Sequence, residues 1–341
     1  MKLCIIDPAC HIPTLKILFE ESEYFAHEPD NFFSYLTTNH YTKLQNYDAE
    51  GFMYDTNWDK INSSNFDILF IVAPLLDYYD PISKELIPYT FNMRDKITKI
   101  INSNSFKLVV IFDVYDYDYD PNEINKNWKV DLYFKRNYNK KKKYNSNVVP
   151  FPFIMFLKPC VMKIALNTKI LNYDKTRKNA VFWAGGLYNH IHALDGIHIN
   201  RQKIHNEIKD LIHSKNLPYD KFIEHMKTYK ICVDLMGVGD PNKRTFEIIA
   251  NGSLMMSMCV NLEWGFDNND EFDKDTFFTT SDEFRIKLHK LLTDETHYKK
   301  CLNTQNEIVT KYFNKNWLRG YIEKNINNLN LPINNIHSTT H

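Results

Sequence analysis

The chain has 341 residues, of which 43% are hydrophobic, and this length suffices for two domains that each bury an apolar core. Its 42 lysine and arginine residues balance 42 aspartate and glutamate residues, so no net charge attracts nucleic acid or an anionic membrane. No apolar run approaches the roughly 20 residues of a membrane-spanning helix, and no signal-type segment precedes the first predicted strand. We therefore expect a cytoplasmic protein with no transmembrane segment and no nucleic-acid partner.

The cysteines favour a reducing compartment. None of the six forms a CxxC pair, and Cys4, Cys232 and Cys259 fall inside strands that we predict to be buried. Buried cysteines of this kind behave as small core residues, and proteins of reducing compartments keep them as free thiols. The sequence therefore predicts no disulfide framework.

The first half of the chain alternates apolar strands with helical segments. The expected strands are 2–6, 66–73, 106–112, 130–134 and 148–153, and the expected helices are 15–21 and 91–103. The segment FDILFIVA at 66–73 is a continuous apolar run, which is typical of a strand in a parallel sheet covered on both faces. The alternation predicts an N-terminal Rossmann-like α/β domain over residues 1–155.

A second α/β series follows. It contains strands 180–183, 231–236 and 254–260 and helices 201–214, 219–229, 242–251, 281–292, 295–313 and 317–331. We predict a C-terminal Rossmann-like domain over 156–315, a C-terminal helix over 316–331 and a polar, disordered tail over 332–341. Two such domains would face a central cleft at the carboxyl ends of both sheets, where ligands of open α/β sheets bind.

The most informative stretch is ICVDLMGVGDPNKRTFEIIANGSLMMSMCV at 231–260. It predicts a strand, a turn with Gly237 and Gly239, a helix ended by Gly252 in a left-handed conformation, and a second strand. Glycines before a helix let backbone N–H groups approach a phosphate. Lys243 and Arg244 fall in the first helical turn, where the helix dipole opposes cations, so their presence suggests a bound anion. The alternative is an ordinary βαβ turn with a solvated Lys-Arg pair, and the residues alone favour neither.

These motifs resemble the donor-binding half of GT-B glycosyltransferases. The stretch from Tyr229 to the strand at 254 is similar to the protein O-glucosyltransferase and capsule xylosyltransferase family, and FWAGG at 182–186 followed by Arg201 resembles another motif of that family. In this chain Trp183 stands where that family has arginine. Residues 244–252 also resemble the Glu-Ala-x-Ala-x-Gly region of retaining, group 1-like GT-B enzymes. The resemblance covers about residues 180–260.

The resemblance implies a glycosyltransferase that moves a sugar from a nucleotide-diphosphate sugar, UDP- or GDP-linked, to a hydroxyl of a glycan or protein acceptor. The leaving diphosphate would be stabilised by arginines and backbone N–H groups, without a metal. Glu247 would accept hydrogen bonds from hydroxyls of the sugar or ribose. The implied donor-binding residues are Gly185, Gly186, Arg201, Gly237, Gly239, Lys243, Arg244, Thr245 and Glu247.

Two residues are candidates for the general base in the N-terminal domain. Asp113 ends the strand FKLVVIFD, and His11 follows the first strand. Either group could accept the proton of a sugar hydroxyl. The alternative for Asp113 is an aspartate that caps a turn. Lys135 and Arg136 end a further strand, where they could help to neutralise phosphate, and the lysine run 140–143 is interpreted as a solvated loop.

Two possible metal sites have less support in the sequence than the donor-binding motifs. Asp116, Asp118 and Asp120 form a double DxD pattern, which in GT-A glycosyltransferases holds Mn²⁺, but here an acidic loop that ends at Asp120-Pro121 is the favoured interpretation. Four histidines form a loose group, but they lack the tight spacing of a zinc site. We interpret them as residues of an open loop together with one histidine on a helix; they are His190, His192, His198 and His205.

Two other functions compete with a transferase. A catalytically inactive GT-B protein that binds a nucleotide sugar or a polysaccharide would keep the donor motifs without a working base. A sugar-nucleotide epimerase would place GxGxxG after the first strand, and residues 7–20 contain no glycine, which argues against that enzyme.

Overall fold

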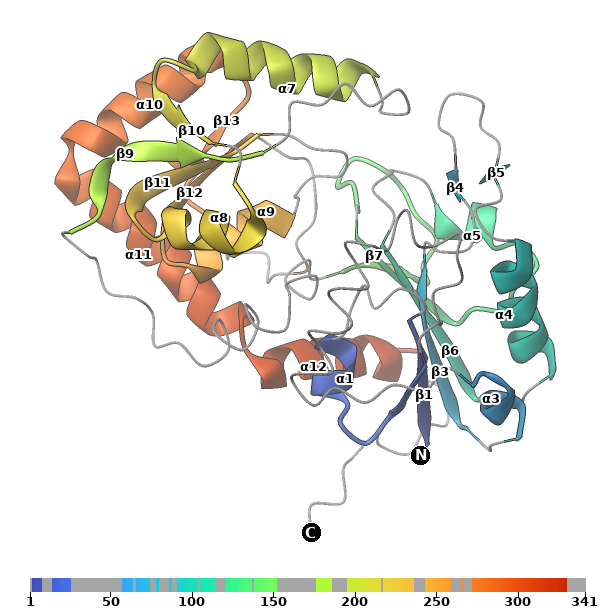
Figure 1. Cartoon of the computed structure of the whole chain (residues 1–341). Coiled ribbons are helices and arrows are strands. Elements are labelled where there is room, and N and C mark those ends of the chain that lie inside the picture. The colour runs from blue at the N-terminus through green and yellow to red at the C-terminus, as the bar shows by residue number, and fades with distance from the viewer. Residues whose placement is uncertain are drawn as a thin grey trace. The chain divides into compact units, whose positions relative to one another are not determined.

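The computed structural model describes residues 2–7, 14–25, 57–63, 66–73, 78–79, 86–87, 91–103, 105–114, 120–136, 138–151, 176–185, 195–215, 217–235, 243–258, 265 and 272–329. It divides into two compact units. The first comprises Met1–Tyr138, Lys142–Pro159 and Leu318–His341, and the second comprises Asn139–Lys141 and Cys160–Trp317. Each unit contains one parallel sheet with helices packed on it (Figure 1).

The sheet of the first unit has the order β2-β1-β3-β6-β7-β8, and all of its pairs are parallel. Its strands are β1 (Leu3–Ile6), β2 (Glu23–Phe25), β3 (Ile68–Ala73), β6 (Leu108–Asp113), β7 (Leu132–Lys135) and β8 (Val148–Pro150). The helices of this part are α1 (Thr14–Leu18), α3 (Asp59–Ser63), α4 (Phe91–Ser103) and α5 (Pro121–Ile124), and β4 (Tyr78–Tyr79) pairs antiparallel with β5 (Leu86–Ile87). Every residue of β6 is buried, as a sheet covered on both faces requires.

Alternate residues of each strand point to opposite faces of this sheet. Leu69 and Ile71 of β3 pack in one hydrophobic cluster with Ile97 of α4. Phe70, between them, faces the other way and lies 5.2 Å from Phe112, with the two rings edge to face. The aromatic face continues through Phe134 and Phe151 of the neighbouring strands and their ends.

Helix α12 (Lys315–Asn327) packs on the aromatic face of the first unit, beside α1 (Figure 1). Arg319 donates to the Glu21 carboxylate at 3.0 Å, and its guanidinium lies 5.0 Å above the Phe19 ring. The Tyr321 hydroxyl donates to the Pro150 carbonyl at 2.7 Å. The chain therefore returns to the first unit after it has built the second.

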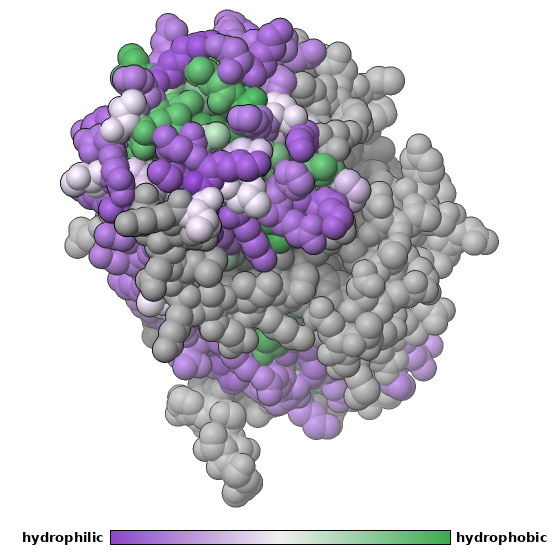
Figure 2. Space-filling model, turned by 60° about the vertical axis from the view of Figure 1, so that its left-hand side comes forward, coloured by the Kyte–Doolittle hydropathy of each residue, from purple (hydrophilic) through white to green (hydrophobic). Residues whose placement is uncertain are grey.

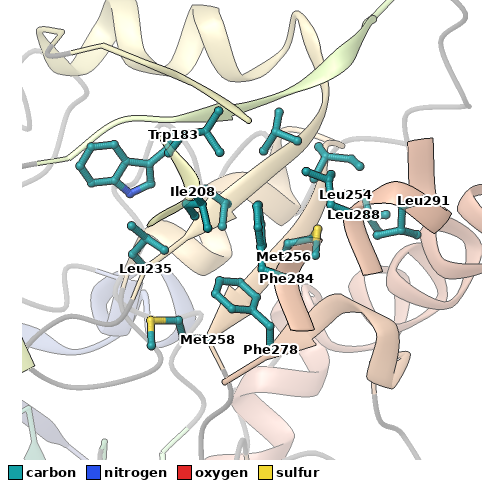
Figure 3. Close-up of a cluster of buried hydrophobic side chains, with 14 of the residues drawn as sticks. Trp183, Ile208, Leu235, Leu254, Met256, Met258, Phe278, Phe284, Leu288 and Leu291 are labelled. Atoms are coloured by element: carbon teal, nitrogen blue, oxygen red, sulfur yellow. The ribbon is translucent and has the colours of Figure 1, made fainter. Parts of the chain in front are cut away.

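The sheet of the second unit has the order β10-β9-β11-β12-β13 and is also parallel throughout. Its strands are β9 (Lys178–Trp183), β10 (Ile212–Ser214), β11 (Tyr229–Asp234), β12 (Leu254–Met258) and β13 (Phe277–Phe278). The helices are α7 (Asp195–Ile208), α8 (Tyr219–Met226), α9 (Lys243–Ala250), α10 (Ser281–Thr293) and α11 (Glu295–Tyr312), with a 3₁₀ turn η2 (Lys274–Thr276). One aliphatic and aromatic cluster joins β9, β11 and β12 to α7, α10 and α11 (Figure 3).

A buried glutamine reinforces β12 from α11. The Met255 N–H donates to the Gln305 side-chain oxygen at 2.9 Å, and the Gln305 amide nitrogen donates to the Ser253 carbonyl at 2.8 Å. Among the described residues, strand β13 pairs with Ser257 and Met258 of β12. Gln305 therefore satisfies backbone groups at the start of β12 and at Ser253 just before it, as buried polar groups require.

The structure corrects two of the predicted helices. The helix predicted over 201–214 is α7, which ends at Ile208, and Ile212–Ser214 forms β10. The helix predicted over 219–229 ends at Met226, and Tyr229 begins β11. In both places apolar residues continue the helical spacing past the end of the helix, so periodicity does not reveal the boundary. Pairing with β9 decides the strand in each case.

Cys4 and Cys232 lie in β1 and β11 as predicted, and they are buried free thiols. Burial raises the pKa of the Cys232 thiol to about 12, so it is protonated at neutral pH and acts as a core residue. Cys259 and the predicted disordered tail at 332–341 lie outside the described residues.

The surface of the described residues is largely polar. Figure 2 shows hydrophilic side chains over most of its coloured part, together with a hydrophobic area. Ile286 is the large hydrophobic side chain that is exposed among the described residues, at 72%. In the part of the chain that the structure covers, no helix combines the length and the apolarity needed to cross a bilayer.

Candidate functional site

The strand order of the second unit identifies the place where a ligand is expected. The chain passes from β9 to β10 on one side, and then to β11 on the other side of β9. In an open parallel sheet, ligands bind beyond the carboxyl ends of the two strands at which the order reverses. The residues that follow these ends are Gly185, two positions after β9, and Leu235, immediately after β11.

Helix α9 is held against the end of β11 by a buried hydrogen bond. The Thr245 hydroxyl donates to the Asp234 carboxylate, and the two residues are 0% and 1% exposed. Gly252 follows the helix with φ 74°, which confirms the predicted left-handed glycine at its C-terminal end. The helix therefore starts and stops where the local sequence predicts, and its first turn is tied to the strand end.

Arg244 lies in that first turn and reaches across to the end of β9. Its guanidinium carbon is 5.0 Å from the centre of the Phe222 ring on α8. Its Nη1 contacts the position that a Cβ at Gly185 would occupy, and that position is 2.9 Å from Cζ2 of Trp183. A side chain at Gly185 would have to displace the guanidinium or the indole, so glycine permits this close approach.

Arg201 reaches the same edge of the sheet from α7. Its Nη2 donates to the Leu235 carbonyl, the first one after β11, at 3.4 Å. Arg201 and Arg244 are both half-buried, so the carboxyl ends of β9 and β11 carry two guanidinium groups. Glu247, one turn after Arg244 on α9, is 4% exposed.

The structure thus brings together four of the predicted donor-site residues on α7, α9 and the end of β9; they are Gly185, Arg201, Arg244 and Thr245. Of these, Thr245 is a buried support of α9. Lys243 opens α9, and its side chain lies outside the described part. The remaining predicted residues outside the described ranges are His11, Gly186, Gly237 and Gly239.

Asp113 ends β6 in the first unit and forms a buried ion pair. Its Oδ2 lies 3.0 Å from Nζ of Lys135, and the two side chains are 3% and 0% exposed. The pair is a direct cross-strand neighbour in the parallel sheet. Asp113 is therefore a strand residue and not a turn cap, and Lys135 is bound to a carboxylate in the sheet. Lysines 140–143 are exposed, consistent with the predicted solvated loop.

Asp120 and His205 have structural contacts. Asp120 is the N-cap of α5 and accepts from the Asn122 N–H at 3.0 Å, so a helix begins at the predicted end of the acidic loop. His205 lies on α7 with its Nε2 3.2 Å from the Ser214 hydroxyl, and burial lowers its pKa. Asp116, Asp118, His190 and His192 and the side chain of His198 lie outside the described part, within which no group of three acidic, histidine or cysteine side chains is arranged to hold a metal.

Sequence reasoning missed Trp183, Phe222 and Asp234, which lie near Arg244 or hold its helix in place. Asp234 carries a recognisable signal, because a carboxylate that ends an apolar strand lies at the ligand edge of a parallel sheet. Phe222 carries none, because its contact with Arg244 joins α8 to α9 and depends on the packing of both helices.

No family model and no curated protein sequence matches the chain, but solved structures do. The T4 phage DNA-modifying enzyme β-glucosyltransferase matches at TM-score 0.54 and 12% identity over 96% of this chain and 100% of that one. Anabaena HepE with UDP and glucose matches at 0.51 and 11% over 96% and 100%. A mutant O-GlcNAc transferase of Thermobaculum terrenum matches at 0.51 and 8% over 96% and 67%. The chain therefore has the predicted GT-B fold, with a parallel α/β sheet in each unit.

Replacing Thr245 by valine should destabilise the protein. The change keeps the shape of the side chain but leaves the buried Asp234 carboxylate without the hydroxyl, and losing a hydrogen bond to a charged group costs about 1.5–3 kcal/mol. Urea unfolding monitored by circular dichroism measures the loss, and Thr245→Ser is the matched control that keeps the hydroxyl. Equal stability of the valine and serine variants would contradict the support assigned to this bond.

Proposed function

We propose that this protein is a glycosyltransferase that moves a sugar from a nucleotide-diphosphate sugar to a hydroxyl of a glycan or protein acceptor. The observation that carries the proposal is the pair of guanidinium groups at the reversal of strand order in the second sheet. In this proposal the second unit binds the donor, and the first unit supplies the base and the acceptor site.

The solved structures of the same fold support a uridine nucleotide and a glucose-type sugar. T4 phage β-glucosyltransferase was crystallised with its UDP-glucose substrate, and HepE with UDP and glucose. A GDP-linked donor remains the alternative. The acceptors of these proteins differ, since one modifies DNA. For this chain the balance of 42 cationic and 42 anionic residues favours a glycan or protein over nucleic acid.

The arginines of the second unit have the chemistry that sugar transfer needs. When the bond between the sugar and the diphosphate breaks, negative charge develops on the leaving diphosphate. Arg244 and Arg201 would bind these oxygens, together with backbone N–H groups before α9 that include those of Gly237 and Gly239, and thereby stabilise the transition state more than the ground state. Glu247 would accept hydrogen bonds from hydroxyls of the sugar or ribose.

Asp113 and His11 are the proposed candidates for the base that removes the proton of the acceptor hydroxyl. The ion pair with Lys135 fixes the Asp113 carboxylate in one orientation, which suits a catalytic group that must be positioned before the reaction. If the protein only binds a nucleotide sugar or polysaccharide, as an inactive member of the fold, Asp113 is a structural residue. Free buried thiols such as Cys4 and Cys232 support a cytoplasmic location.

Arg244→Ala should weaken UDP binding about tenfold or more, because a charge-assisted bond to phosphate is worth about 1.5–3 kcal/mol. Its melting temperature should stay close to that of the parent, since a cation in the first turn opposes the helix dipole. Arg244→Lys should rescue poorly, because an ammonium cannot bridge two oxygens as a guanidinium does. Isothermal titration calorimetry with UDP and with UDP-sugars measures both effects.

Three further variants sharpen this experiment. Gly185→Ala should also weaken UDP binding, because the added Cβ occupies the position that Nη1 of Arg244 contacts. Lys203→Ala, at an exposed position of α7, is the matched control and should leave affinity unchanged. Glu247→Gln should keep most affinity for UDP while losing discrimination between donor sugars. If a folded Arg244→Ala protein binds UDP as the parent does, the donor site is wrongly assigned.

Donor binding and turnover should persist after dialysis against EDTA. The proposed site neutralises the diphosphate with two guanidinium groups and backbone N–H groups, so it needs no divalent cation to balance the charge. The measurement is UDP release from a panel of UDP- and GDP-sugars, with Mn²⁺ added back as the control. Activity that disappears with EDTA and returns with Mn²⁺ would instead assign a role to the acidic segment with Asp116 and Asp118.

Asp113→Asn should lower turnover by about a hundredfold or more, the usual contribution of a positioned base, while UDP affinity of the second unit stays unchanged. The change leaves Lys135 buried beside a neutral amide, which costs about 3–5 kcal/mol. The double variant Asp113→Asn/Lys135→Met removes that buried charge and keeps the test valid if the single variant unfolds. Parent-like turnover in either folded variant would eliminate Asp113 as the base and leave His11.

A further inference from the structure

Trp183 is the last residue of β9 and carries an unexplained polar group. Its side chain packs with Ile208 and Leu235 at one end of the aliphatic cluster (Figure 3), and the residue is 4% exposed. Its indole Nε1 is buried and has no hydrogen-bond partner among the residues that the structure describes. Buried N–H groups in folded proteins are nearly always satisfied, and one that is not needs an explanation. A phenylalanine would fill this apolar space without that penalty.

The indole lies inside the arginine site. The Cβ position above Gly185 is 2.9 Å from Cζ2 and 3.4 Å from Cε2 of Trp183, and Cε2 is the carbon bonded to Nε1. Nη1 of Arg244 contacts the same position. The edge of the Trp183 indole that includes Cε2 and the guanidinium of Arg244 therefore approach the same point above Gly185, at the carboxyl end of β9.

His205 packs against the indole of Trp183. Its ring centre is 4.6 Å from that of Trp183, at an interplanar angle of 50°. Burial lowers its pKa, so the imidazole is neutral at pH 7, and its Nε2 is held by the Ser214 hydroxyl. His205 thus supports the indole without adding charge, and the cationic character of the site comes from its arginines.

The described groups at this edge are mainly hydrogen-bond donors. Arg244, Arg201 and the Trp183 N–H point to one kind of partner, an oxygen that carries negative charge, because charge-assisted bonds to such oxygens are the strongest available. An apolar ligand would leave the N–H unsatisfied, and a cation would be repelled by the guanidinium groups.

We propose that Trp183 is a ligand-binding residue whose Nε1–H donates to an oxygen of the diphosphate that Arg244 binds. The inference rests on the proposed donor site. It places a neutral hydrogen-bond donor, the indole N–H of Trp183, beside the charged guanidinium of Arg244 at the end of β9. Trp183 then contributes to affinity for the diphosphate group itself, whichever sugar is attached to it.

Trp183→Phe tests this directly, because phenylalanine keeps an aromatic ring and removes the N–H. The variant should bind UDP about five- to tenfold more weakly by isothermal titration calorimetry, and a cooperative melting transition in the absence of ligand checks that it is folded. Trp128→Phe is the matched control: the Trp128 Nε1 donates to the Thr98 hydroxyl at 2.9 Å in the first unit. That variant should lose stability and keep the parent affinity for UDP.

A second measurement tests the same hydrogen bond without relying on a change in affinity. The chain has 5 tryptophans, and ¹⁵N-labelled protein should show their indole N–H resonances. The resonance absent from Trp183→Phe should shift downfield when UDP is added, as expected for a new bond to a charged oxygen. If Trp183→Phe does not fold, Trp→Phe changes at the other four positions assign the Trp183 resonance by elimination.

The outcomes separate this inference from the proposed function. If Arg244→Ala loses UDP affinity while Trp183→Phe keeps it and the indole resonance does not move, the diphosphate site stands. Trp183 is then only a core residue, with its N–H served by a buried water, and the inference is overturned. If neither variant loses affinity for UDP, the donor site is wrong and the role of Trp183 fails with it.

Discussion

The buried hydrogen bond from Thr245 to Asp234 is the contact on which the candidate site depends. It ties the first turn of α9 to the carboxyl end of β11, and it does so with groups that water does not reach. A buried carboxylate requires such a partner, so the register between helix and strand is fixed. Arg244 is the neighbour of Thr245 and therefore projects over Gly185, next to Trp183.

The same principle recurs at the carboxyl edge of the first sheet. Asp113 is paired with Lys135, and Asp7, directly after β1, accepts from the Tyr24 hydroxyl at 2.7 Å. Each aspartate ends or follows an apolar strand and is almost completely buried. Buried charges of this kind contribute little net stability, but they are expensive to misplace. They hold polar groups in fixed positions at the edge of the sheet where α/β proteins bind ligands.

The parallel arrangement of both sheets explains why so much of the fold could be predicted. A strand that is buried on both faces has to be apolar throughout, as FDILFIVA at 66–73 is, and it therefore stands out from the amphipathic helices around it. Gly252 was predictable for a local reason, since its positive φ follows from the end of a helix. The edge strands β10 and β13 were not, because two or three residues carry too little pattern, and only pairing with β9 and β12 defines them.

The sequence by itself determined the α/β class and the order of the main strands and helices, because these depend on local periodicity and turn chemistry. It also singled out Arg244 as a candidate by a charge placed against a helix dipole, whereas Gly185 and Arg201 became candidates only through the resemblance to a known family. Only the tertiary structure decided that Thr245 supports the helix, that Asp113 pairs with Lys135, and that the Trp183 indole lies beside the guanidinium of Arg244. Each of these contacts joins two different elements of the chain, and the side-chain packing that creates them leaves no periodic signal in the sequence.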